Sequence, residues 1–182
     1  MKKLLLLSAL LIFAFGFGQT AKEYFQSGYD KAEAKDFYGA ISDFTKVIEL
    51  NPNDDEISYI KNGKTRYISN SDAYYNRGVA KYELKDYYRA ISDYNKVIEL
   101  DPYYTFAYYN RAVSKYYIKN YYGAISDYSR AIELNPNYTS AYKNSGGAKE
   151  KLGDLNGACV DWKQAAKLGD TDAAGWVANK CN

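Results

Sequence analysis

Carboxylates and two thiols are the side chains of this sequence with the clearest potential for chemistry. The 182 residues contain no histidine, which removes the commonest general base, the usual partner of serine and cysteine nucleophiles, and most zinc ligands. The chain has 22 acidic residues, so a site built from carboxylates alone is the remaining route to hydrolysis. The sequence has no glycine-rich phosphate loop, dinucleotide fingerprint or metal-ligand motif.

The acidic residues that could form such a site recur at fixed places along the chain. They are Asp43, Asp93, Asp127 and Asp161, with Glu49, Glu99 and Glu133. A catalytic pair should occur once, whereas these residues occur in several copies, so we interpret them as structural. The sequence therefore predicts a protein that is not an enzyme and that uses no cofactor and no metal. A carboxylate-based hydrolase is the least favoured alternative.

The charge of the chain is nearly balanced, with 24 basic and 22 acidic residues. It lacks the basic run or basic excess that neutralises phosphates, so we expect no nucleic-acid partner. Tyrosine alone supplies 22 residues, so much of the apolar surface consists of amphipathic rings.

Residues 1–18 have the features of a secretory signal peptide. Lys2 and Lys3 form a charged start, residues 4–15 are apolar apart from Ser8, and glycines stand at positions 16 and 18. The apolar run is shorter than the roughly 20 residues that a membrane-spanning helix needs. We expect cleavage after Gly18, no stable membrane span afterwards, and an exported protein that is periplasmic or extracellular. A membrane anchor is the alternative.

An internal repeat organises the rest of the chain. The phrase IELNP or IELDP ends three segments, at Pro52, Pro102 and Pro136, and the last step is 34 residues. A fourth copy, without the proline, begins at Thr139. Within each copy, apolar or small residues recur twice at helical spacing, which predicts two amphipathic helices joined by a short polar turn.

Polar residues at the turns can cap the helices of each copy. Ser71, Thr105 and Thr139 stand before the first helices, and Asp86, Asn120 and Asp154 stand before the second helices. The proline after each second helix ends it, because its ring and its missing N–H forbid continuation.

The copies closely resemble the tetratricopeptide repeat. Aromatic residues occupy the fourth and twenty-fourth places, Gly or Ala the eighth, and Ala the twentieth. These residues are Tyr24, Tyr74, Tyr108 and Tyr142; Phe44, Tyr94, Tyr128 and Trp162; Gly28, Gly78, Ala112 and Gly146; and Ala40, Ala90, Ala124 and Ala158. The resemblance implies an all-α fold, a right-handed superhelical solenoid of four helical hairpins.

We place the solenoid at residues 19–182, with repeats at 21–52, 71–104, 105–138 and 139–170 and a C-terminal capping helix at 171–182. An insertion at 53–70 lengthens the first step by sixteen residues. Asn62 and Gly63 lie between segments of good strand propensity, which favours a β-hairpin over the alternative of a disordered loop.

A layer of charge recurs inside the predicted hairpins. Every copy has Lys at its eleventh place and Asp at its twenty-third, and two copies have Arg at the seventh, where the family usually has apolar residues. Because the two helices run antiparallel, the eleventh and twenty-third places lie at similar heights. We predict partly buried pairs of Lys81 with Asp93 and of Lys115 with Asp127, joined by Arg77 and Arg111, respectively.

The resemblance also implies which residues line the inner wall of the superhelix. In the family these are the second, fifth, ninth and twelfth places of each first helix. The large apolar residues at those places here are Phe25, Tyr29, Tyr75, Val79, Tyr82, Phe106, Tyr109, Val113 and Tyr116. Exposed aromatic residues at a concave centre are typical anchors of peptide recognition, so we predict that these bind a partner. For Tyr82 and Tyr116, packing between neighbouring helices is an equal alternative.

The two thiols lie at equal distances from the turn near Asp170. Cys159 takes a place where the other copies have isoleucine, and Cys181 lies eleven residues beyond the turn. An antiparallel pair of helices would bring the thiols side by side, and export would permit a disulfide. Two independent buried thiols are the alternative.

Together these patterns predict a non-catalytic scaffold or adapter of the cell envelope. Its expected partner is a protein or peptide bound in the aromatic groove, and the chain is expected to be a monomer or to associate weakly. A solenoid that self-associates end to end is the main alternative.

Overall fold

The structure, a computed structural model, describes residues 19–54, 57–61 and 64–181. The signal-peptide prediction therefore lies outside the described residues. The elements in chain order are α2 (Ala21–Glu33), α3 (Phe37–Leu50), β1 (Ile57–Lys61), β2 (Lys64–Ile68), α4 (Asn70–Glu83), α5 (Tyr87–Leu100), α6 (Thr105–Tyr117), α7 (Tyr121–Leu134), α8 (Thr139–Lys151), α9 (Leu155–Lys167) and α10 (Thr171–Lys180).

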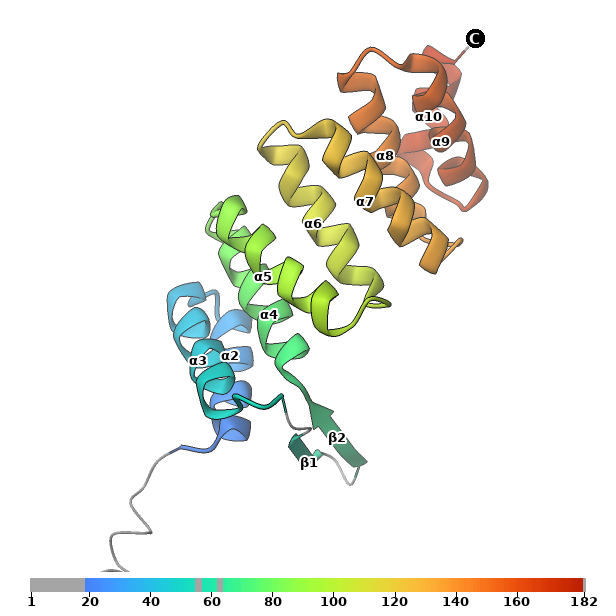
Figure 1. Ribbon diagram of the computed structural model, residues 1–182. Helices are drawn as coiled ribbons and strands as arrows, with labels where there is room; N and C mark the ends of the chain where they lie inside the picture. The colour runs from blue at the N-terminus through green and yellow to red at the C-terminus, as the bar shows by residue number, and fades with distance from the viewer. Residues whose placement is uncertain (1–18, 55–56, 62–63, 182) are drawn as a thin grey trace, which may run out of the picture.

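The helices stack as antiparallel hairpins in chain order (Figure 1). Each first helix packs on its own second helix, as α4 does on α5, and each second helix packs on the next first helix, as α5 does on α6. The last helix, α10, packs on α9 and closes the stack. The predicted all-α solenoid with a capping helix is confirmed.

The first helices form the inner face of the curved stack. Consecutive first helices (α2 with α4, α4 with α6, α6 with α8) touch one another, whereas contacts between consecutive second helices are sparser. We call the surface made by α2, α4, α6 and α8 the first-helix face. In the part of the chain that the structure describes, every helix is too short or too polar to cross a bilayer.

The turns inside the hairpins follow local chemistry. Asp86, Asn120 and Asp154 each accept a hydrogen bond from a backbone N–H in the first turn of the second helix, as predicted. The residue before the first two of these caps is a lysine with positive φ, and the residue before the third is Gly153, with φ +81°. Glycine adopts that conformation without steric cost, whereas a lysine does not.

The predicted caps of the first helices are wrong by one or two positions. Ser71 lies inside α4, whose N-cap is Ser69. Thr105 and Thr139 are the first residues of α6 and α8, and the tyrosines before them make no side-chain cap. Helix α6 therefore begins without the side-chain acceptor that the sequence suggested.

Small residues let each pair of helices approach closely around a buried ring. A Cβ added to Gly78 would lie 2.8 Å from the Tyr94 ring, and one added to Gly28 would lie 3.0 Å from Phe44. Both rings are fully buried, so these glycines are required by packing. The recurring small and aromatic places are the core of the solenoid.

The insertion contains the predicted β-hairpin. Strands β1 and β2 pair antiparallel, with Ile57 opposite Ile68 and Lys61 opposite Lys64. The two turn residues lie outside the described residues. The Asn70 side chain donates to the backbone oxygen of Asn51 over 2.7 Å, which ties the two ends of the insertion together.

Candidate functional site: the first-helix face

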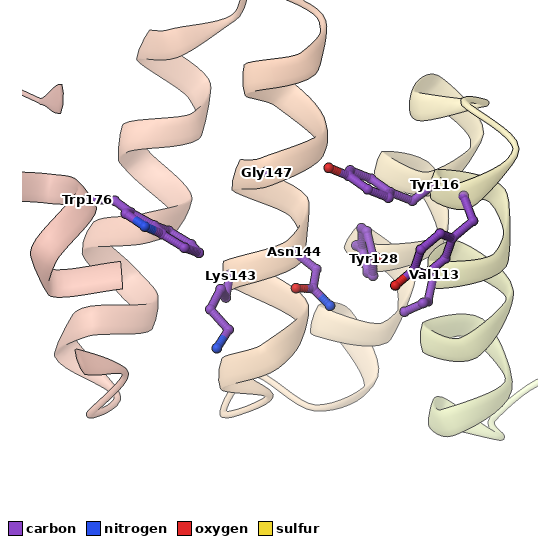
Figure 2. A pocket seen from close by; sticks show the side chains of 8 residues that line it. Val113, Tyr116, Tyr128, Lys143, Asn144, Gly147 and Trp176 are labelled. Carbon is purple, nitrogen blue, oxygen red and sulfur yellow. The ribbon is translucent and has the colours of Figure 1, made fainter. Parts of the chain in front are cut away.

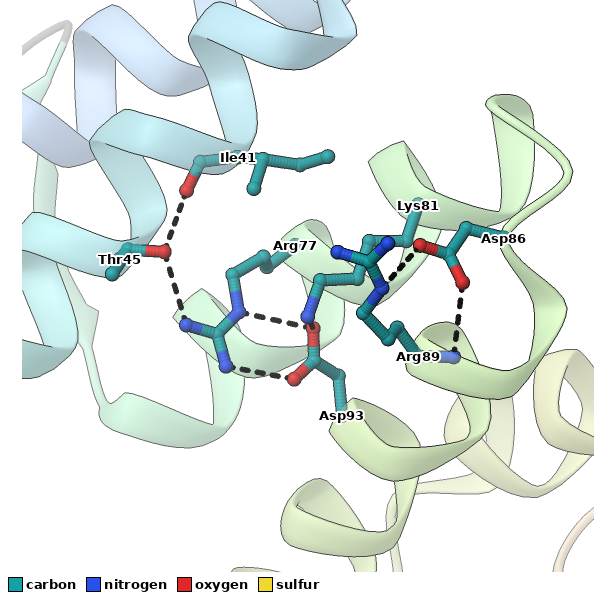
Figure 3. Close-up of polar contacts among 7 residues, drawn as sticks. All are labelled: Ile41, Thr45, Arg77, Lys81, Asp86, Arg89 and Asp93. Atoms are coloured by element: carbon teal, nitrogen blue, oxygen red, sulfur yellow. Dashed lines mark hydrogen bonds and ion pairs between the residues drawn. The ribbon is translucent and has the colours of Figure 1, made fainter.

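The charge layer is built as the sequence predicted (Figure 3). The Asp93 carboxylate accepts two hydrogen bonds from Arg77, at 2.7 and 3.0 Å, and lies 2.7 Å from the Lys81 ammonium. The Arg77 guanidinium also donates to Thr45 of the preceding hairpin over 3.0 Å. One cluster thus joins the helices of a hairpin to each other and to their neighbour.

The next hairpin repeats this arrangement. Asp127 accepts from Arg111 at 2.7 and 2.8 Å and lies 2.8 Å from Lys115. Arg111 also donates to Asn95 of the preceding hairpin. The first and fourth hairpins keep only the lysine pairs, Lys31 with Asp43 and Lys149 with Asp161, each at 2.7 Å. The recurring aspartates are therefore occupied in structural ion pairs, which leaves them poorly suited to acid–base chemistry.

The two cysteines lie where the turn near Asp170 brings them together. Cys159 of α9 and Cys181, directly after α10, form a disulfide with 5.6 Å between their Cα atoms. The bond fastens the end of the capping helix to the last hairpin.

Two of the predicted partner-binding tyrosines are built into the junctions between hairpins. The Tyr75 hydroxyl accepts a hydrogen bond from Asn110 over 2.9 Å, and the Tyr109 hydroxyl accepts one from Asn144 over 2.9 Å. Burial raises the pKa of Tyr75, although the hydrogen bond from Asn110 opposes the shift, and the pKa of Tyr109 is raised for the same reason. Both rings therefore stay neutral at physiological pH and act first as inter-repeat contacts.

The other predicted residues divide by exposure. Tyr29 and Phe106 are 42% and 57% exposed, and the Phe106 ring meets the Tyr138 ring edge-on. Phe25, Val79, Tyr82, Val113 and Tyr116 are partly buried. Among these, Phe25 meets the Phe44 ring edge-on, and Tyr82 and Tyr116 pack on other tyrosines at the same edge of the face.

A pocket of about 210 Å³ opens on the C-terminal half of this face (Figure 2). Its lining residues come from four helices: Val113, Tyr116 and Tyr117 from α6, Tyr128 from α7, Lys143, Asn144 and Gly147 from α8, and Trp176 from α10. Figure 2 shows Trp176 on one side of α8 and the tyrosines with Val113 on the other. We call this space the α8 pocket.

Sequence reasoning had assigned only Val113 and Tyr116 of these residues to the site. Gly147 and Lys143 stood at inner-wall places of the fourth copy but are not apolar anchors. Trp176 belongs to the capping helix, which the repeat pattern does not position. Elsewhere, in residues 19–181 as far as they are described, no group of three or more His, Cys, Asp or Glu side chains could hold a metal ion.

The fold and this face define a class of protein, the helical-hairpin repeat solenoids, which present an extended inner surface to their ligands. Residues 71–104 and 105–138 match the sequence profile of the tetratricopeptide repeat, so the second and third hairpins are tetratricopeptide repeats. Comparison with curated protein sequences gives no match.

Several solved structures share the fold. A MamA crystal structure is 25% identical, with a TM-score of 0.71, and the alignment covers 84% of this chain and 74% of MamA. The first tetratricopeptide domain of Spaghetti (RPAP3), bound to an HSP90 peptide, is 27% identical, with a TM-score of 0.58 over 61% of this chain and 90% of that domain. YrrB, described as having an unusual peptide-binding site, is 17% identical, with a TM-score of 0.71 over 87% of this chain and 74% of YrrB.

Proposed function

We propose that the protein is a non-catalytic scaffold that binds a segment of a partner protein on its first-helix face. The α8 pocket, whose lining includes the exposed Tyr117, is the observation that carries the proposal, since apolar concavities with aromatic walls are favoured places for anchoring side chains. The RPAP3 domain, which has a similar fold, is bound to a peptide, and this supports a peptide ligand here.

We expect a ligand that the first-helix face does not hold by its terminal carboxylates. Family members that bind such ligands place Lys, Asn and Arg on the inner wall. Here the corresponding places hold Phe25, Phe106 and Asn110, and the Asn110 amide already donates to Tyr75. An apolar or aromatic segment is the better match to this wall.

We further propose that the scaffold works outside the cytoplasm, in the periplasm or beyond. The signal-like residues 1–18 and the Cys159–Cys181 disulfide both support export, because disulfides persist in oxidising compartments. Mass spectrometry of the protein purified from its native compartment tests this: we expect a chain that begins at Gln19, and a full-length chain retained in the cytoplasm would refute it.

Binding is tested with two matched double variants. Tyr29→Ser with Phe106→Ser removes exposed rings from the first-helix face. Tyr88→Ser with Tyr122→Ser removes rings that are 73% and 76% exposed in the first turns of the second helices. Affinity capture from envelope extract, followed by titration of the purified partner, should show weaker binding for the first pair only, by about 1–3 kcal/mol per anchor residue. Equal loss in both pairs, or in neither, would contradict a site on the first-helix face.

A further inference from the structure

Two adjacent glycines in the middle of α8 differ in their surroundings. A Cβ added to Gly146 would lie 2.5 Å from Nε1 of Trp162, so the close approach of that indole requires glycine. A Cβ added to Gly147 would meet nothing within 4 Å. Packing therefore explains the first glycine and not the second.

Gly147 carries a stability cost that packing does not require. Glycine inside a helix is destabilising relative to alanine, because it loses more backbone freedom on folding. The equivalent places of the earlier hairpins hold Tyr29, Val79 and Val113. The missing side chain in the fourth hairpin leaves open the space that forms the α8 pocket.

The size of the pocket limits what can enter it. A cavity of about 150 Å³ lined by apolar side chains holds one benzene molecule, and sites for drug-sized ligands or cofactors start at roughly 300 Å³. The α8 pocket, at about 210 Å³, matches a single ring. Aromatic side chains on both sides, Tyr116 and Trp176, can meet such a ring edge-on or offset, which are the favoured geometries.

The charge at the edge of the pocket favours a ligand that carries a positive group next to the bound side chain. The Lys143 ammonium lies 2.9 Å from Asp170 and 3.4 Å from Asp172, so one cation faces two carboxylates. The Asp172 side chain is 68% exposed and makes the longer of the two contacts. This side of the pocket therefore has a net negative charge and an accessible carboxylate.

We propose that the α8 pocket binds one aromatic side chain of the partner, from a segment in which basic residues flank that side chain. The inference rests on the proposed function and specifies the ligand of the same face. The occupant is one residue of a peptide rather than a free small molecule or a second copy of this chain.

The test uses blocked tripeptides as probes, with phenylalanine or leucine at the centre and lysine or glutamate at both flanks. The chain has two tryptophans, so an NMR spectrum has two indole N–H signals, one from Trp176 in the pocket lining and one from the buried Trp162, whose ring packs on Trp176 at 5.2 Å. We expect the Lys-Phe-Lys peptide to shift the Trp176 signal more than the Trp162 signal, because only Trp176 lines the pocket. Leucine at the centre, or glutamate at the flanks, should weaken binding about three- to tenfold.

The decisive variant is Gly147→Leu, which adds a side chain to the pocket lining at a position where an added Cβ meets no atom within 4 Å. It should weaken the Lys-Phe-Lys peptide at least about tenfold, as expected when a hydrophobic anchor is excluded. Gly175→Ala is the matched control, because an added Cβ there also meets nothing within 4 Å but Gly175 does not line the pocket. It should leave binding unchanged.

Each outcome decides the proposal. Equal binding by Gly147→Leu, or no shift of the Trp176 signal, overturns it, and so does free indole or phenol binding as tightly as the peptide. Concentration-dependent changes in the Trp176 signal without any peptide would assign the pocket to a second copy instead. If the partner is captured equally by wild type and Gly147→Leu but is lost from the Tyr29 and Phe106 double variant, the proposed function stands and this inference fails.

Discussion

Asp127→Asn should destabilise the protein far more than the loss of one surface charge would. The carboxylate is 6% exposed, and it faces an arginine and a lysine side chain that are 16% and 20% exposed. Removing its charge leaves Arg111 and Lys115 partly buried beside each other without an anion, and a lone buried charge is costly.

The size of the destabilisation depends on the hydrogen bond that the asparagine amide can still make. Removing one partner of a buried ion pair costs about 3–5 kcal/mol, and the asparagine oxygen can keep one hydrogen bond to Arg111, so we expect about 2–4 kcal/mol. For a chain of this length, that lowers the melting temperature by about 5–15 °C. Replacing Arg111, Lys115 and Asp127 together by apolar residues of similar volume should recover part of this loss, because no unpaired charge remains.

Thermal unfolding followed by circular dichroism measures the effect, with Glu133→Gln as the control. Glu133 lies on the same helix and pairs with Arg130 at 2.8 Å, but the two side chains are 64% and 41% exposed. Loss of this exposed pair should cost less than about 1 kcal/mol. If Asp127→Asn shifts the melting temperature no more than Glu133→Gln does, the reasoning about the charge layer is wrong.

Three further perturbations test other parts of the stack. Cys159→Ser should destabilise the protein by roughly 3 kcal/mol in the chain-entropy model and should speed amide hydrogen exchange in α10 only. If the wild-type protein accepts two alkyl groups in the absence of a reductant, the disulfide is excluded. Gly146→Ala should lower the free energy of unfolding and Gly147→Ala should raise it, the latter by about 0.5–1 kcal/mol, and changes of the same sign would contradict the packing argument. Because burial raises the pKa of Tyr75, its contribution to stability should be constant below about pH 10, the usual tyrosine pKa, and decline as pH rises above it. Urea midpoints of wild type and Tyr75→Phe across that range should show a smaller decline in the variant.

The recurring part of the fold could be predicted because each recurring residue packs in the same surroundings in every hairpin. Ala90 and Tyr94 lie one repeat before Ala124 and Tyr128, and the two pairs are buried in equivalent layers of the core. The charge layer was predictable for the same reason, since Lys and Asp recur together. The β-hairpin was predictable from Asn62 and Gly63 with their flanking strands, a signal that is local in sequence.

The candidate site could be predicted only in part because its contacts cross between repeats that differ. Whether Tyr109 faces a ligand or the next hairpin depends on Asn144, which lies 35 residues further along and captures its hydroxyl. The α8 pocket depends on a missing side chain at Gly147 and on Trp176, which the capping helix brings in from outside the repeat. The repeat period predicts where the recurring residues lie. It says little about a pocket that is lined by residues occurring only once.

The junctions between hairpins show why the pocket lies at the C-terminal end. Two kinds of side-chain hydrogen bond recur between hairpins: an arginine donates to the preceding second helix, as Arg77 does to Thr45, and an asparagine donates to a tyrosine of the preceding first helix, as Asn144 does to Tyr109. The fourth hairpin keeps the asparagine, but at the arginine place it has Ser145. It thus loses one of the two contacts, and beside it the disulfide holds α10, the wall that carries Trp176, against α9. The covalent bond orders the capping helix beside a hairpin whose junction lacks the arginine contact, so a glycine that opens a pocket can be tolerated there.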